Sequence, residues 1–185
     1  MTDSTVYPYK DVSINRFGGY DCQIEHPAFG WLPHTVEPDS ALETAIKADT
    51  TITVTAYPVA SAIAEQEQVI RSACAAAITA GVTSSALGAA HTYPLSDTDQ
   101  ANLNASVVAS LTPDLASDWT TAVWCEDADG NWALTAHTAS QIQTVGVAAK
   151  AWVVACQTQK QAMFTTLSAC TTAEEVAAVV WSNPS

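Results

Sequence analysis

Apolar and polar residues change their spacing along the chain near residue 59. Before this point, residues 21–25 and 50–57 alternate apolar or β-branched residues with polar ones, and a period of two is typical of β-strands. Beyond it, apolar residues recur at spacings of three and four, as on one face of an amphipathic helix. The pattern predicts a small β-rich module over residues 1–59 and a helical α+β domain over residues 60–185. The β-rich module is the better candidate for docking, because short strands with free edges can add to a partner sheet.

Helix-capping residues and helix breakers mark four helices in the second domain. Serine and threonine cap helix N-termini because their hydroxyl oxygens accept free backbone N–H groups, whereas glycine and proline end helices. The intervening residues 86–95 are expected to form an edge strand or a loop. The expected helices run from Ser61 to Gly81, from Ser96 or Asp97 to about Leu111, from Thr138 to about Ala169 and from Thr172 toward Trp181.

A β-hairpin is expected over residues 118–137. Two stretches of strand character, 118–125 and 131–137, flank residues 127–130, where Asp129-Gly130 supplies the positive φ of a tight turn. The predicted fold class is therefore α+β. A small N-terminal β-module precedes a mainly helical domain with a β-hairpin or small antiparallel sheet and a long C-terminal helix.

Composition and charge exclude several kinds of partner. Hydrophobic residues make up 48% of the chain, which is typical of a globular protein. Nineteen acidic residues stand against six scattered basic ones, and the net charge of -13 predicts no nucleic-acid partner. No apolar run approaches the roughly 20 residues of a membrane-spanning helix, so no membrane partner is expected either. The first residues lack a secretion signal, which indicates synthesis in the cytoplasm.

Two groups of residues superficially resemble metal sites. Cys22, His26 and His34 lie close in sequence, but a structural zinc needs a fourth ligand, which is missing. Residues 127–131 resemble part of a calcium loop, but the bidentate glutamate of such a loop is absent. We expect no metal and no cofactor. The five cysteines are an odd number without a CxxC pair and are expected to be reduced, mostly buried thiols.

No catalytic motif stands out in the sequence. There is no nucleophile elbow, phosphate-binding loop or zinc-protease motif. A glycan hydrolase would need two carboxylates in a cleft, whereas Glu126 and Asp129 are expected at an exposed hairpin tip. The sequence predicts a protein that is not an enzyme, with no catalytic residues.

The six tryptophans are the most unusual enrichment. Aromatic side chains dominate both protein cores and protein interfaces. Trp124 and Trp132 are expected on paired hairpin strands, where they either cover the helices behind the sheet or anchor a partner. The candidate partner-binding residues are Phe29, Trp31, Trp124 and Trp132.

Two segments resemble bacteriophage tail-fibre-associated proteins. Residues 14–33, with the run His26-Pro27-Ala28-Phe29-Gly30-Trp31-Leu32-Pro33, resemble short N-terminal modules of proteins encoded beside tail-fibre genes. Residues 69–181 are similar to an uncharacterised phage domain at the C-termini of tail-fibre and fibre-assembly proteins. The matching features are Tyr93-Pro94-Leu95-Ser96-Asp97, the tryptophan-containing hairpin, the long helix and Thr171-Thr172-Ala173-Glu174-Glu175-Val176 before Trp181.

The resemblance implies a structural component of a phage tail, made in the host cytoplasm and located in the virion tail. Its expected partners are other tail proteins of the fibre or baseplate, and fibre symmetry suggests a homotrimer by analogy. The alternative is a tail-fibre assembly chaperone that is absent from the mature virion. Such chaperones usually carry a more basic final helix, whereas the long helix here holds only Lys150 and Lys160.

Overall fold

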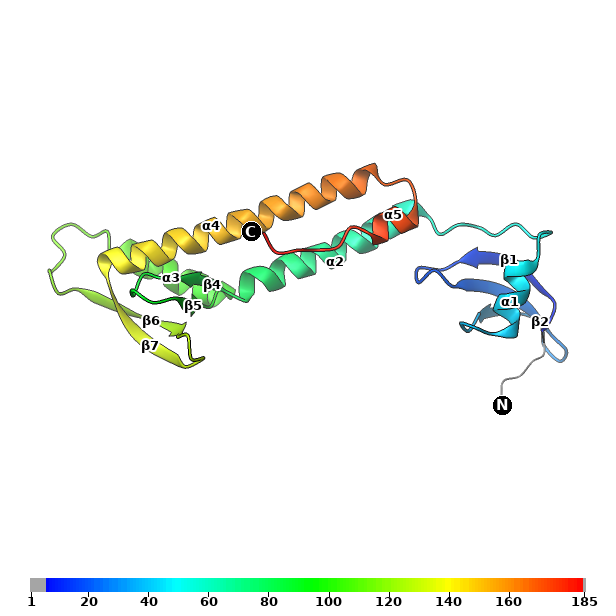
Figure 1. Cartoon of the computed structure of the whole chain (residues 1–185), viewed down its shortest axis with the longest axis horizontal. Helices are drawn as coiled ribbons and strands as arrows, with labels where there is room; N and C mark the ends of the chain where they lie inside the picture. Colours follow the sequence, from blue (N-terminus) through cyan, green and yellow to red (C-terminus); the bar gives the residue numbers. More distant parts are fainter. Residues whose placement is uncertain (1–5, 185) are drawn as a thin grey trace. The chain divides into compact units, whose positions relative to one another are not determined.

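The computed structural model describes residues 6–184 and divides into two compact units (Figure 1). Of the described residues, the first unit comprises 6–65 and 170–178, and the second comprises 66–169 and 179–184. Each unit combines helices with a small antiparallel sheet, and this confirms the α+β class. The sequence pattern changes near residue 59, whereas the units divide between Glu65 and Gln66, inside one helix.

The first unit contains a three-stranded antiparallel sheet with the order β1-β2-β3. Its strands are β1 (Tyr9–Ile14), β2 (Tyr20–His26) and β3 (Gly30–Thr35). Helix α1 (Ala41–Ala48) supplies Ile46 to a small core with Val12, Cys22 and Val36. Strand β2 contains the predicted extended residues 21–25, because their alternation places Cys22 and Ile24 on the core side.

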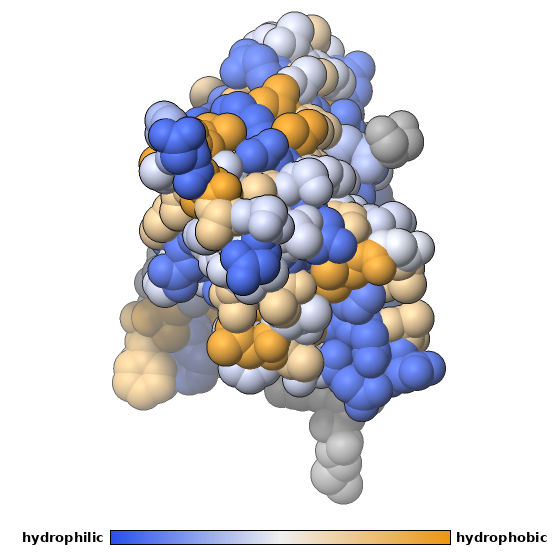
Figure 2. All heavy atoms as spheres, turned by 90° about the vertical axis from the view of Figure 1, so that its left-hand side faces the viewer, coloured by the Kyte–Doolittle hydropathy of each residue, from blue (hydrophilic) through white to orange (hydrophobic). Residues whose placement is uncertain are grey.

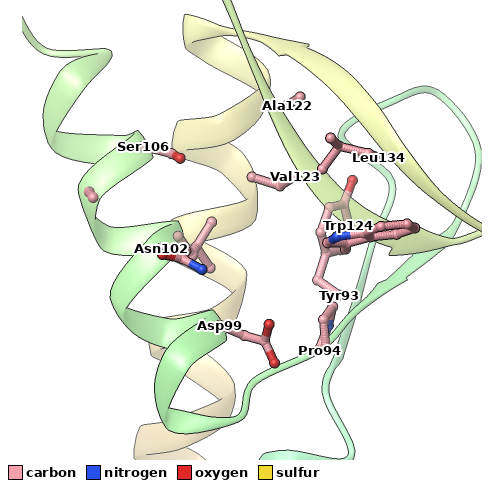
Figure 3. Close-up of a pocket in the computed structure, with 11 residues that line it drawn as sticks. Tyr93, Pro94, Asp99, Asn102, Ser106, Ala122, Val123, Trp124 and Leu134 are labelled. Atoms are coloured by element: carbon pink, nitrogen blue, oxygen red, sulfur yellow. The ribbon is translucent and has the colours of Figure 1, made fainter.

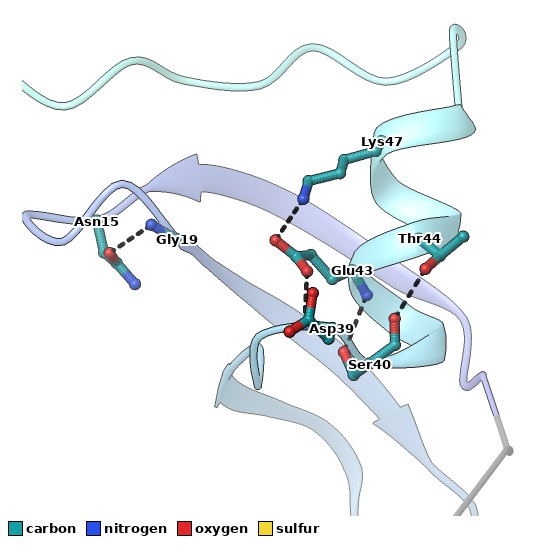
Figure 4. A network of polar contacts seen from close by, with 7 residues as sticks. All are labelled: Asn15, Gly19, Asp39, Ser40, Glu43, Thr44 and Lys47. Atoms are coloured by element: carbon teal, nitrogen blue, oxygen red, sulfur yellow. Dashed lines mark hydrogen bonds and ion pairs between the residues drawn. The ribbon is translucent and has the colours of Figure 1, made fainter. Parts of the chain in front are cut away.

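Helix α1 was not predicted from the sequence pattern, although its start carries a cap. The Ser40 hydroxyl accepts the Glu43 N–H at 3.1 Å, and the Glu43 carboxylate accepts the Asp39 N–H at 2.8 Å. Glu43 also pairs with Lys47 at 2.7 Å, one helical turn further on (Figure 4). These local contacts fix the helix start, although the eight-residue helix shows only two turns of periodicity.

The strand expected over residues 50–57 was wrong. Only Thr55 pairs with another strand, through one parallel bridge to Ser13. The Thr55 N–H donates to the Val12 carbonyl at 2.9 Å, and the Ile14 N–H donates to the Thr55 carbonyl at 2.8 Å. β-Branched residues favour a pleated, half-buried surface rather than pairing as such, and here Ile52 and Val54 pack on the core without a ladder.

The second unit contains a four-stranded antiparallel sheet with the order β4-β5-β6-β7. The predicted hairpin is confirmed as β6 and β7. Residues 86–95 contain the short strand β5, which lies between β4 and β6 and is therefore not the edge strand that was expected. The strands are β4 (Val82–Ser84), β5 (His91–Tyr93), β6 (Thr120–Glu126) and β7 (Trp132–Thr138). Three helices contribute to this unit: α2 (Val59–Thr79), which begins in the first unit, α3 (Asp97–Ala109) and α4 (Ala139–Ala169).

Local signals located most helix starts correctly. Ser96 caps α3 through a capping box with Asp99, and Thr138 exchanges hydrogen bonds with Gln141 at the start of α4. Thr172 caps the short helix α5 (Ala173–Ala177), which is grouped with the first unit. Ser61, in contrast, is not a cap: α2 starts two residues earlier, and the Ser61 N–H donates to the Pro58 carbonyl at 2.9 Å.

The core of the second unit lies between the sheet and helices α2, α3 and α4. Ile142, Val145 and Cys156 are fully buried on α4. Among residues 6–184, no helix is long and apolar enough to cross a membrane. The same residues bring together no cluster of His, Cys, Asp or Glu side chains that could hold a metal ion.

Candidate functional site

One face of the β6–β7 hairpin exposes large apolar side chains. The register pairs Trp124 with Leu134 and Glu126 with Trp132, so these side chains point to the same side of the sheet. Trp124 is 54% exposed, Trp132 48% and Leu134 58%. We call this surface the hairpin face; it consists of Ala122, Trp124, Glu126, Trp132, Leu134 and Ala136.

The opposite face of the hairpin is held firmly by buried contacts. Cys125 and His137 are buried there. The Nδ1 atom of His137 lies 2.8 Å from the Thr135 carbonyl, which can only accept, so this nitrogen carries the proton. The Nε2 atom then accepts the Tyr93 hydroxyl at 2.8 Å. This bond joins β5 to β7 and makes the hairpin a rigid support for the hairpin face.

Burial changes the proton affinity of both partners in this contact. Loss of hydration is the main cause that lowers the pKa of His137, so the neutral imidazole is favoured. The same cause raises the pKa of Tyr93 to about 12. Both groups are therefore uncharged at neutral pH, and the pair acts as an internal hydrogen bond rather than as an acid–base site.

A groove of about 440 Å³ runs between α3 and the hairpin. Asp99, Asn102 and Ser106 point from α3 toward the hairpin (Figure 3). Trp124 and Leu134 of the hairpin face contribute to the opposite wall. The groove therefore joins a polar helix surface to the exposed apolar surface of the sheet.

A second, larger groove lies between α3 and α4. Its volume is about 1060 Å³. The lining is mainly aliphatic, with Val107 and Leu111 on α3 and Val147 and Val154 on α4. Among the residues that the structure describes, Lys150 is the only charged one that lines it.

Phe29 and Trp31 belong to the first unit, at the turn between β2 and β3 and in β3 itself. Phe29 is 73% exposed and its ring centroid lies 4.9 Å from that of His26. Trp31 is 38% exposed, and the Lys10 ammonium group lies over its ring, 4.2 Å from the ring centroid. Cys22 and His34, which are paired in the β2–β3 register, do not form a metal cluster with His26 among the described residues.

Sequence reasoning named Trp124 and Trp132 but missed Leu134 and the wall formed by α3. Leu134 could have been found, because Trp132, Leu134 and Ala136 are spaced by two along a strand. The contribution of α3 could not, because it depends on how the helix packs beside the sheet. The remaining tryptophans Trp119, Trp152 and Trp181 pack against the core, and Trp152 donates its indole N–H to the Ala77 carbonyl at 3.1 Å.

The segment that carries this site is strongly acidic. No lysine or arginine occurs between Arg71 and Lys150. Hydrophobic and hydrophilic patches alternate on the surface of the second unit that is seen from its hairpin end (Figure 2). The acidic residues between those two positions are Asp97, Asp99, Asp114, Asp118, Glu126, Asp127 and Asp129.

The carboxylates at the hairpin tip have a structural role. Asp127 accepts the backbone N–H groups of Asn131 and Asp129, each at 2.9 Å, and the bonds from Asn131 are the main cause that lowers its pKa. Asp129 and Gly130 are exposed in the turn. These residues shape the turn.

Comparison with protein families finds a match over much of the chain. Residues 61–180 match the family described as a domain of unknown function, DUF4376. No curated protein and no solved structure matches the chain. Because the family match covers more than half of the sequence, the chain belongs to the DUF4376 family.

Proposed function

We propose that this protein is a structural component of a phage tail that attaches to the fibre or baseplate through protein–protein contacts. The observation that carries the docking role is the hairpin face, where Trp124, Trp132 and Leu134 are each about half exposed on a rigid support. The phage setting is supported by the resemblance of residues 14–33 and 69–181 to tail-fibre-associated proteins.

Burial of the hairpin face in a partner would be favourable. Contiguous exposed apolar surface is unusual in a monomeric protein, and aromatic residues are enriched at the centres of interfaces. The support is already ordered by the Tyr93–His137 bond, so little conformational entropy is lost on docking. A rigid, aromatic surface of this kind suits a lasting contact between subunits.

The first unit offers a second exposed apolar set. Phe29 is largely exposed, and Trp31 and Leu32 are partly exposed on β3. Strand β3 is an outer strand of its sheet, but Pro33 lacks a backbone N–H and weakens strand addition there. Side-chain contacts from Phe29 and Trp31 are the more favourable mode for this unit.

A tail-fibre assembly chaperone is the second candidate. The α3–α4 groove favours it, because a large, open, aliphatic channel of about 1060 Å³ suits transient cover of an apolar client segment. Such a protein would leave before the particle is complete. The two candidates therefore differ in whether the chain is found in the finished virion.

Mass spectrometry of gradient-purified phage particles tests this proposal. We expect the chain at a fixed ratio to the major tail proteins. Abundant protein in the infected-cell lysate combined with absence from particles would overturn the structural role and favour the chaperone.

A double substitution, Trp124→Ser with Leu134→Ser, tests the surface. We expect it to reduce incorporation into particles. The matched control is Val69→Ser, which removes an apolar side chain that is 56% exposed on α2 and lies outside the hairpin face. Equal incorporation of both variants would contradict the role of the hairpin face.

A further inference from the structure

The groove between α3 and the hairpin has an open strand edge as one wall. Strand β5 pairs with β6 at Thr92 and Glu126 alone. Among the described residues, Thr120–Cys125 of β6 therefore has a strand neighbour on the β7 side only. Residues 122–124 of this edge line the groove. Backbone groups at an open edge can pair with an added extended segment.

The side chains around this edge combine apolar surface with negative charge. Trp124 and Leu134 provide the apolar surface, and Asp99 stands on the opposite wall (Figure 3). The Oδ2 atom of Asp99 accepts both the Ser96 hydroxyl at 2.5 Å and the Ser96 N–H at 3.2 Å. No hydrogen bond to its Oδ1 atom occurs within residues 6–184.

Positive charge in the second unit lies outside the segment that forms the groove. Between Arg71 and Lys150 the sequence holds acidic residues and no lysine or arginine. The ion pairs found within residues 6–184 are Lys47–Glu43 and Arg71–Glu67, and neither involves a groove residue. The negative potential of this segment is therefore not neutralised from within, and it favours a cationic partner.

We infer that this groove binds an extended, cationic segment of a partner protein, with a lysine or arginine side chain between Asp99 and Trp124 and aliphatic side chains on Leu134. The inference rests on the proposed docking function and names the chemistry of the partner. The carboxylate attracts the cation, and the indole face adds a cation–π contact. Alternate residues of an extended segment point to the same side, so its aliphatic side chains reach the hairpin face.

A second copy of this chain is a poorer occupant. The net charge is -13, and each copy would bring the same acidic segment to the contact. Like charges facing each other across an interface disfavour association. A basic partner would neutralise the negative charge of this acidic segment, whereas a second copy would add to it.

Selection from a displayed library of random short peptides tests this inference with the full-length protein. We expect enrichment of peptides that carry lysine or arginine next to aliphatic residues. Their affinity should fall about tenfold in each of the variants Trp124→Ser and Asp99→Asn, since a cation–π contact or a charge-assisted bond is worth about that factor. Binding should also weaken as salt is added.

Matched control variants separate a specific groove from general attraction to an acidic protein. Phe17→Ser removes an exposed aromatic side chain from the first unit, and Asp114→Asn removes an acid that does not line the groove. Both should retain affinity. Thermal unfolding of every variant checks the fold, and Leu134→Ser repeats the test at an exposed position that caps no helix. Peptides without net positive charge, or equal losses in groove and control variants, would overturn the inference.

The result is distinguishable from the outcome of the particle experiment. If the chain is a fixed part of the virion but no cationic peptide is enriched, the inference fails and the proposed function stands. If cationic peptides bind the groove but the chain is absent from particles, the structural tail role fails while the groove chemistry holds.

Discussion

His137 shows how one buried polar residue supports the surface on the other side of its strand. It is fully buried and its two ring nitrogens bond to Tyr93 and Thr135. Protonation would place a second N–H against the Tyr93 hydroxyl and a charge in a desolvated site, which is costly. The hairpin face therefore depends on a neutral imidazole.

Stability should fall in mild acid because of His137. Its pKa in the folded state is lowered by burial, so the unfolded chain, with a histidine pKa of about 6.5, binds the proton more readily. The contribution of His137 to the free energy of unfolding is complete above about pH 6.5 and is lost as the pH falls through that value toward the folded pKa. Urea unfolding at several pH values measures how steeply the free energy of unfolding changes with pH. The variant His137→Gln should flatten it, and an unchanged slope would contradict this assignment.

Gly81 is a second residue on which the structure depends. It follows α2 with φ of +100°, and a Cβ atom there would collide with the Tyr93 carbonyl oxygen. Because backbone cannot rotate away as a side chain can, Gly81→Ala should cost about 3 kcal/mol or more. Gly88→Ala is the matched control: its φ is +93° but its surroundings are open, so about 1 kcal/mol is expected. Thermal or urea unfolding compares the two, and equal losses would rule out the collision.

Hydrogen bonds at the helix N-termini determine where α3 and α4 begin in the second unit. Helix α3, one wall of the groove, begins at a capping box in which Ser96 and Asp99 accept each other's backbone N–H groups. The long helix α4 follows β7 directly through the Thr138–Gln141 bonds. Short local bonds of this kind fix where each helix starts and thereby place the groove walls.

Removing the cap of α3 should loosen the groove wall. Ser96→Ala leaves the Asp99 N–H without its acceptor, and the expected loss is about 1 kcal/mol of unfolding free energy. Hydrogen exchange should speed up first at the N-terminus of α3. Ser117→Ala, at an exposed loop position, is the control and should change neither quantity. A loss at both positions would indicate that the cap is not the cause.

At the scale of the whole molecule, both cores contain free thiols. Cys22 belongs to the core of the first unit, whereas Cys74, Cys125 and Cys156 belong to the core of the second. Burial is the main cause that raises the pKa of Cys22 and of Cys156, which lowers their thiolate fraction. The prediction of buried thiols is confirmed for these four.

Alkylation of the native protein should therefore be selective. Cys170 is partly exposed and should react first, whereas the four buried thiols should react only after unfolding. Peptide mass spectrometry after timed alkylation, with and without denaturant, measures the order. Rapid native labelling of Cys74 or Cys156 would contradict the packing of α2 against α4.

The sequence alone determined features that depend on neighbouring residues. Ser96 and Thr138 predicted helix starts because their capping bonds span three residues, and Asp129-Gly130 predicted the turn because glycine readily adopts positive φ. The two stretches of strand character on either side of this turn placed Trp124 and Trp132 on one hairpin.

The tertiary structure decided the features that depend on pairing between distant segments. Residues 50–57 lack a ladder because only Thr55 reaches β1, and the groove exists because β5 leaves most of β6 unpaired beside α3. Such contacts join residues far apart in the chain, and no local pattern carries that information.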